Sequence, residues 1–185
     1  MPVRKIRILI AVIAVAAMLA AVGWAGVSAQ LAGGLKLEGA WIARVTSYEG
    51  GAWPFLTQWS YVVTADPSGR RGTVHGSVDV PFPGVPGDYV TPIIGEVIQT
   101  GPETAIDNSI WYHVLKASPV NQIVAIGTAK GEWRRLGPDK VETTIHFAIY
   151  EASADTNGDG IPEPGATPIA AFTVTTVDTR VPLPR

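Results

Sequence analysis

The stretch from Gly127 to Tyr150 constrains the fold most, because it reads as two β-strands joined by a tight turn at Leu136–Lys140. From Val141 onward, side chains alternate between two faces. One face holds Val141, Thr143, Ile145, Phe147 and Ile149, and the other holds Glu142, Thr144, His146, Ala148 and Tyr150. A period of two with β-branched and aromatic residues predicts a half-buried antiparallel strand.

The rest of the chain repeats this pattern. Further strands are predicted at 37–48, 57–65, 71–80, 89–99, 108–117, 121–128 and 168–177. Turn-forming segments such as Asp66–Gly69 separate them, and no segment has the period of an amphipathic helix. Eight or nine short, evenly spaced strands predict an all-β fold, an antiparallel β-barrel of about eight strands, with a β-sandwich as the alternative.

The first residues have the features of a secretory signal. Arg4, Lys5 and Arg7 precede the apolar run Ile8–Val22, and Val27-Ser28-Ala29 is a small-residue cleavage site. We therefore expect a signal peptide at residues 1–29, cleaved near Ala29, and a secreted or extracytoplasmic domain at residues 30–185. The alternative is an uncleaved signal that anchors the chain in a membrane as a helix.

Charge and cysteine content exclude some functions. The chain has 14 basic and 16 acidic residues, and its basic pairs, Arg70-Arg71 and Arg134-Arg135, are isolated. A nucleic-acid interface would need a clustered basic face, so no such partner is expected. With no cysteine, the chain has neither disulfides nor a thiolate metal site, and an apolar core must hold the fold.

A Gly-x-Trp motif opens the first predicted strand as Gly39-Ala40-Trp41, and a second occurs at Gly131-Glu132-Trp133. The first resembles the opening motif of lipocalins and the wider calycin barrels, and the layout is similar to exported bacterial lipocalin-like proteins of unknown function. The resemblance implies an eight-stranded barrel in which Trp41 closes one end. It also implies that a late arginine, Arg180 or Arg134, packs across that tryptophan.

The leading functional hypothesis is non-enzymatic: a small apolar or amphipathic ligand bound in the barrel. An eight-stranded barrel is wide enough for one such molecule or for its own side chains. The ligand-binding candidates are Trp59, Tyr61, Trp111, His146 and Tyr150. The alternative is that the tryptophans only pack in the core.

Histidine and glutamate offer a second hypothesis, a small-barrel isomerase or cyclase acting on a lipid-like substrate. His113, His146 and Glu142 would converge with Tyr150 if the barrel interior held the second face of the 141–150 strand. Such a group could supply an acid, a base or metal ligands. The alternative is that His113 is a hydrogen-bonded core residue and that His75 faces solvent.

The segment from Asp155 to Glu163 matches the first half of a calcium-binding loop. The oxygen ligands would come from Asp155, Asn157, Asp159, the Ile161 carbonyl and Glu163. Ala166 occupies the place of the final glutamate of an EF-hand, so a calcium-tied loop in a structural or adhesion module is the form expected. The alternative is a turn rich in Asx and glycine residues without an ion.

Overall fold

The computed structural model describes residues 34–49, 58–77 and 84–182. The chain divides into two compact units, Met1–Gly34 and Leu35–Arg185, and the structure described below belongs to the second. The predicted signal peptide and its cleavage site lie outside the described residues. Within the described ranges, no helix has the length and apolar character that a membrane crossing requires.

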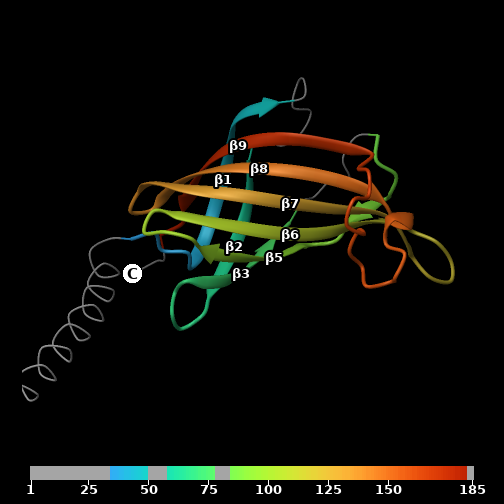
Figure 1. Ribbon diagram of the computed structural model, residues 1–185, viewed down its shortest axis with the longest axis horizontal. Helices are drawn as coiled ribbons and strands as arrows, with labels where there is room; N and C mark the ends of the chain where they lie inside the picture. Colours follow the sequence, from blue (N-terminus) through green and yellow to red (C-terminus); the bar gives the residue numbers. More distant parts are fainter. Residues whose placement is uncertain (1–33, 50–57, 78–83, 183–185) are drawn as a thin grey trace, which may run out of the picture. The chain divides into compact units, whose positions relative to one another are not determined.

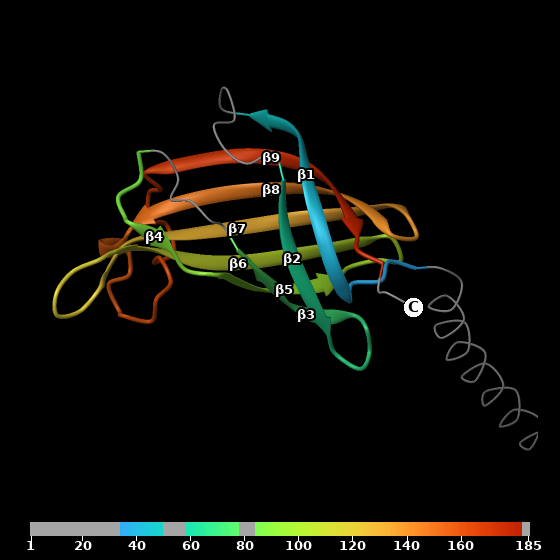
Figure 2. The ribbon, with the colours of Figure 1, turned by 180° about the vertical axis from the view of Figure 1, so that it is seen from behind.

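Nine antiparallel strands and one short 3-10 helix make up the described structure (Figure 1). They are β1 (Gly39–Glu49), β2 (Gln58–Ala65), β3 (Arg71–Gly76), β4 (Tyr89–Val90), β5 (Ile93–Gln99), β6 (Thr104–Leu115), β7 (Gln122–Gly137), β8 (Lys140–Glu151), η1 (Ala152–Ala154) and β9 (Ala170–Arg180). The ring runs β1-β2-β3-β5-β6-β7-β8-β9, and β9 pairs with β1. Eight of the strands therefore form a closed barrel, which confirms the predicted fold class (Figure 2).

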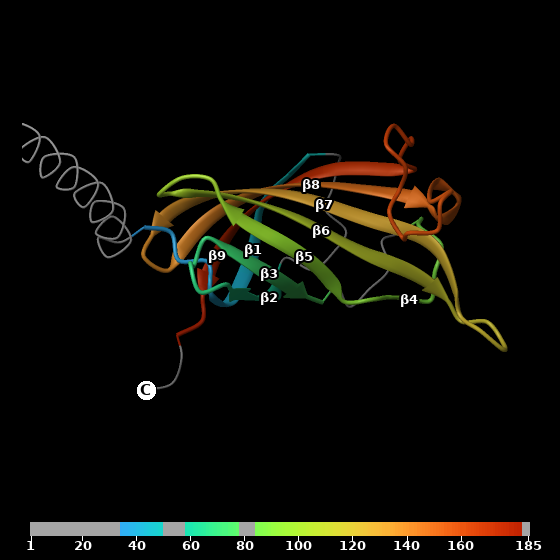
Figure 3. The same cartoon turned by 60° about the horizontal axis from the view of Figure 1, so that its bottom comes forward.

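The β7–β8 hairpin contains β7, the longest strand of the barrel. In Figure 3, β7 and β8 lie above β2 and β3. Gly137 pairs with Lys140, so Pro138-Asp139 forms the tight turn that the sequence predicts. The segments predicted separately at 121–128 and around Gly131 are one continuous strand. The apolar face of β8 points inward: Val141 and Ile149 are fully buried, whereas His146 is exposed.

The strand predicted at 89–99 is interrupted. β4 and β5 both pair with β6 and are separated by Thr91-Pro92. Proline has no N–H group to donate to the sheet, which breaks the ladder at this point. Thr91 bridges the gap. Its backbone N–H donates to the Tyr112 carbonyl at 2.9 Å, and its hydroxyl accepts the Tyr112 N–H at 3.0 Å.

The last strand extends further than the sequence pattern indicates. The pattern ends at Val177, but β9 continues to Arg180, and Asp178 pairs with Ala43 on one side and Val141 on the other. An aspartate is a poor strand residue by propensity. Here its side chain accepts hydrogen bonds inside the barrel, which stabilises the extra pairing.

Two glycines of β7 leave space for side chains of β6. Gly127 is paired with Trp111, and Gly131 with Asp107. A Cβ atom on Gly127 would lie 2.0 Å from the Trp111 ring, and one on Gly131 would lie 1.9 Å from Asp107 Oδ1. The side chains of β6 therefore lie directly across the backbone of β7, and only glycine allows this.

The buried side chains form two clusters, one toward each end of the barrel. The first contains Leu35, Leu37, Trp41, Ala43, Tyr61, Val63, Val74, Val97, Ala105, Trp133 and Val141. The second is built on Trp111, Ala125, Ala129, Phe147, Ile149 and Val174, with half-buried apolar residues packed against it. Trp59 contacts both clusters.

Candidate functional site in the barrel interior

One end of the barrel is closed by Trp41 and Arg180, and we call this the closed end. The Arg180 guanidinium lies 4.6 Å from the centre of the Trp41 ring. It also donates hydrogen bonds to the carbonyls of Lys36 and Glu38, while Trp41 Nε1 donates to the Leu37 carbonyl at 3.0 Å. This is the packing that the resemblance to lipocalins implies, with Arg180 as the cation.

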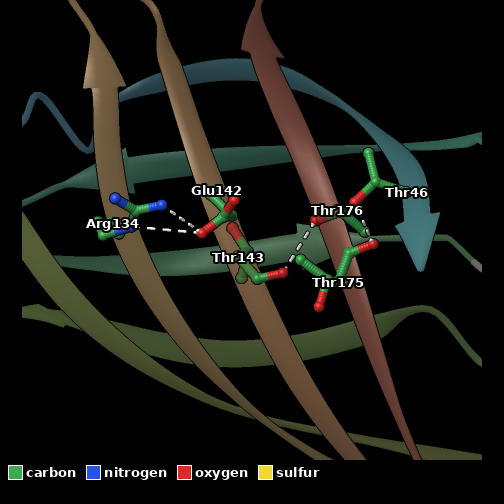
Figure 4. Close-up of polar contacts among 6 residues, drawn as sticks. All are labelled: Thr46, Arg134, Glu142, Thr143, Thr175 and Thr176. Carbon is green, nitrogen blue, oxygen red and sulfur yellow. Dashed lines mark hydrogen bonds and ion pairs between the residues drawn. The ribbon is translucent and has the colours of Figure 1, made fainter. Parts of the chain in front are cut away.

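Arg134, the other candidate cation, lies on the outer surface. It pairs with Glu142 across β7 and β8 at 2.7 Å (Figure 4). Both side chains reach solvent, so this contact is a surface ion pair and takes no part in closing the barrel.

Aromatic rings fill the interior next to the closed end. Trp41 stacks on Tyr61 with the ring centres 6.4 Å apart, and Trp133 meets both rings edge-on at 5.9 and 5.7 Å. All three side chains are at most 8% exposed. No ligand can enter this part of the interior unless one of these rings moves.

A polar layer follows, in which two aspartates point into the barrel. We define the polar layer as Asp107, Ser109, Thr143, Thr176 and Asp178, all of them buried. Trp133 Nε1 donates to Asp107 Oδ1 at 2.6 Å, and the Ser109 hydroxyl donates to Oδ2 at 3.2 Å. Each oxygen of Asp107 thus has a donor.

Only one of the two carboxyl oxygens of Asp178 has hydrogen-bond donors. The Tyr61 hydroxyl (2.6 Å) and the Thr143 hydroxyl (2.9 Å) both donate to Oδ2. The Thr176 hydroxyl lies beside the Asp178 carboxyl group, but its own hydrogen bond goes to the Thr143 carbonyl at 3.4 Å (Figure 4). Asp178 Oδ1 is buried and has no hydrogen-bond partner.

Burial governs the protonation of this layer. It raises the pKa of Asp178 and of Asp107, and the charge of Asp178 raises the pKa of Asp107 further. Burial and the contact with Asp178 raise the pKa of Tyr61 well above its ordinary value, so its hydroxyl stays a donor. None of the ion pairs in the described part of the chain includes Asp107 or Asp178.

Beyond the polar layer lies a group of aromatic side chains that we call the aromatic cluster: Tyr48, Trp59, Trp111, Phe147 and Phe172. Phe147 stacks on Phe172 at 5.0 Å and meets Trp111 edge-on at 5.8 Å, and Tyr48 contacts Phe172 at 5.8 Å. Tyr48 faces inward because a β-bulge between Val45 and Ser47 shifts the register of β1.

The aromatic cluster is less tightly enclosed than the closed end. Tyr48, Trp59 and Phe172 are half-buried, as is Ile145. Ile145 lies in the middle of β8 on its inner face, between the buried Thr143 and Phe147. Its accessible surface therefore faces the interior of the barrel, on the side of the aromatic cluster.

His113 is fully buried beside this cluster. Trp111 Nε1 donates to His113 Nε2 at 3.2 Å, and burial lowers the pKa of the imidazole to about 4. At neutral pH the ring is uncharged and acts as a hydrogen-bond acceptor for the tryptophan.

The sequence-predicted site residues separate into two groups. Three of them are on inner faces. Tyr61 belongs to the first core cluster, Trp111 belongs to the second, and Trp59 packs against both. His146, Glu142 and Tyr150 are on the other face of β8, where His146 is exposed and contacts Thr173 Oγ1 at 3.1 Å.

The expected convergence of His113 with His146 and Glu142 therefore does not occur. It required the second face of β8 to point inward, but the apolar side chains of the first face occupy the interior. Burial of Phe147 and Ile149 outweighs burial of an imidazole and a carboxylate, which would have to be desolvated.

The predicted calcium loop is a compact turn held by its own side chains. Asp155 accepts backbone N–H groups from Gly158, Asp159 and Gly160 at 2.8–3.1 Å, and Asp159 Oδ1 accepts the Ile161 N–H at 2.8 Å. Glu163 instead accepts from the Thr156 hydroxyl at 2.9 Å. In the described ranges no group of three or more acidic or histidine side chains is placed to hold a metal, and calcium binding stays a prediction.

Sequence reasoning missed the two aspartates of the polar layer. Asp107 is an even number of residues from Trp111 and His113, so the alternation of side chains along β6 places it on the same face as these residues, and this is a usable signal that it points inward. Asp178 carries no such signal, because the alternating pattern of β9 ends one residue before it.

Comparisons with known proteins add only a distant similarity. Neither the models of known protein families nor the curated proteins give a match. A solved structure entitled "Structure of EF1p2_mFAP2b bound to DFHBI" is similar at 16% identity and a TM-score of 0.43. The similarity covers 78% of this chain and 94% of that one, and no functional conclusion follows at this level.

Proposed function

We propose that this barrel binds a small apolar or amphipathic molecule against the aromatic cluster. The observation that carries the proposal is the contrast between the two halves of the interior. The rings of Trp41, Tyr61 and Trp133 at the closed end are at most 8% exposed, whereas the aromatic cluster contains half-buried side chains on inner faces. Half-buried aromatic residues inside a barrel are a hydrophobic surface that a ligand can cover.

The energetics favour such a ligand. Covering apolar surface stabilises a complex by roughly 25 cal/mol per Å². Aromatic contacts add about 0.5–1.5 kcal/mol per ring pair. Stacking of Phe147 on Phe172 already fixes two of the rings, so little side-chain freedom would be lost on binding.

Nile red, an uncharged apolar fluorophore, tests the proposal directly. We expect a saturable rise in its fluorescence with the wild-type protein. Ile145→Trp would place a larger side chain in the space next to the aromatic cluster, and should weaken binding by roughly tenfold or more. Thr144→Trp is the matched control, since it adds the same side chain to the outer face of β8.

Circular dichroism melts of each variant establish that it is folded. No saturable signal with the wild-type protein, or equal binding by Ile145→Trp and Thr144→Trp, would refute binding at the aromatic cluster. If Nile red binds as expected, native mass spectrometry of protein purified from its own host would identify any natural ligand by mass.

A further inference from the structure

The inner side chains change from polar to apolar in the same direction on three strands of the barrel. On β6 the order is Asp107, Ser109, Trp111; on β8 it is Thr143, Ile145, Phe147; and on β9 it is Asp178, Thr176, Val174, Phe172. The polar layer therefore lies between the closed end and the aromatic cluster. A ligand lying against the aromatic cluster has the polar layer at its inner end.

Asp178 Oδ1 is the one acceptor of the two carboxyl groups without a donor. It belongs to a side chain that is 1% exposed, and its sister oxygen already accepts from Tyr61 and Thr143. Buried polar atoms in folded proteins nearly always have partners. Since Asp107 has a donor on each oxygen, the free acceptor is specific to Asp178.

The charges around Asp178 favour a cationic donor. The titratable and charged groups that face it are Asp107 from β6 and Tyr61 from β2, and both are acids. Arg180, next on the inner face of β9, is engaged by Trp41, by two backbone carbonyls and by Asp139. An anionic head group would meet two carboxyl groups, whereas a cation would complement them.

We propose that the ligand is a lipophilic amine, whose protonated nitrogen donates a hydrogen bond to Asp178 Oδ1 while its apolar body lies against the aromatic cluster. This inference rests on the proposed function. The rings add to the selectivity, because a cation is attracted to the face of an indole or phenyl ring, and Trp59 contacts both core clusters.

Displacement of Nile red by octylamine, octanol and octanoate tests the inference, since these compounds share a chain length and differ in the head group. With the wild-type protein, octylamine should displace the fluorophore at a concentration roughly tenfold lower than octanol, and octanoate should be the weakest. Asp178→Asn should abolish the preference for octylamine over octanol. Glu142→Gln, which removes an acid from the outer face of β8, should retain it.

The outcomes separate the two proposals. Saturable Nile red binding with equal displacement by the three compounds, or with octanoate strongest, would overturn the amine and leave ligand binding intact. Absence of Nile red binding would overturn both. If Asp178→Asn does not fold, the order of the three compounds on the wild-type protein still decides.

Discussion

The guanidinium of Arg180 lies over the indole of Trp41, with its carbon atom 4.6 Å from the ring centre. The two residues are also paired in register between β9 and β1. The same guanidinium bonds to carbonyls just before β1 and forms an ion pair with Asp139 at 3.3 Å, in the β7–β8 turn. One side chain near the end of the last strand thus connects three separate segments at the closed end.

Arg180→Ala should destabilise the protein markedly. It removes a cation–π contact of about 0.5–2 kcal/mol and hydrogen bonds from a charged donor, so the free energy of unfolding should fall by about 2 kcal/mol or more. Urea unfolding followed by tryptophan fluorescence measures the change. Arg134→Ala is the control, because loss of its exposed pair with Glu142 should cost about 1 kcal/mol or less. Equal losses in the two variants would contradict the role given to Arg180.

Gly131→Ala should displace Asp107. The added methyl group would lie 1.9 Å from Asp107 Oδ1, the atom that accepts the Trp133 hydrogen bond. We expect a loss of roughly 1–3 kcal/mol, typical of an overpacked core, together with a change in tryptophan fluorescence. Gly137→Ala serves as the comparison, since its methyl group would be 3.9 Å from the nearest atom. Equal unfolding free energies for Gly131→Ala and Gly137→Ala would refute this packing.

His113 should make the stability depend on pH. Its pKa falls from 6.5 to about 4 on folding, so the unfolded chain binds more protons between these values. The neutral imidazole therefore contributes fully to the free energy of unfolding above pH 6.5, and this contribution declines as the pH falls toward 4. Subtracting the unfolding free energy of His113→Gln from that of the wild type isolates this decline, because the acids of the polar layer are present in both. A difference that stays constant with pH would contradict it.

Asp155→Ala should loosen the 155–163 loop, because three backbone N–H groups lose their acceptor. The side chain is half-buried, and we expect the free energy of unfolding to fall by about 1–2 kcal/mol in urea titrations. Asp159→Ala, which removes fewer such bonds, should cost less. The reverse order of the two variants would show that Asp155 does not organise the loop.

Calcium binding by the same loop is a separate prediction. Millimolar calcium should raise the melting temperature of the wild-type protein and should not raise that of Asp155→Ala. A melting temperature unchanged by calcium and by EDTA would show that the loop is a turn without an ion.

The alternating pattern of side chains was enough to predict the barrel. Tyr61 and Val63 of β2 share the inner face as the period of two requires, and Trp41 is buried at the closed end, as the resemblance of its Gly-x-Trp motif to that of lipocalins implies. Strand ends were harder to predict. The break before Pro92 and the extension of β9 through Asp178 depend on hydrogen bonds to residues that are distant in sequence.

The functional candidates were predicted less well, for a related reason. The choice of which β8 face points inward decides whether His146 or Phe147 lies in the barrel, and the more apolar face was the better guide. Asp107 and Asp178 break the rule that inward positions are apolar. Such exceptions are characteristic of functional sites, but a single sequence does not show where they meet in space.

The glycines at 127 and 131 limit which substitutions β6 and β7 can accept. Trp111 and Asp107 belong to β6, yet they supply the inner surface over the bare backbone of β7. Enlarging either position on β7 therefore demands a smaller residue directly opposite on β6. Each glycine and its β6 neighbour thus form a pair that has to be substituted together, because a larger residue on β7 alone would overpack the barrel interior.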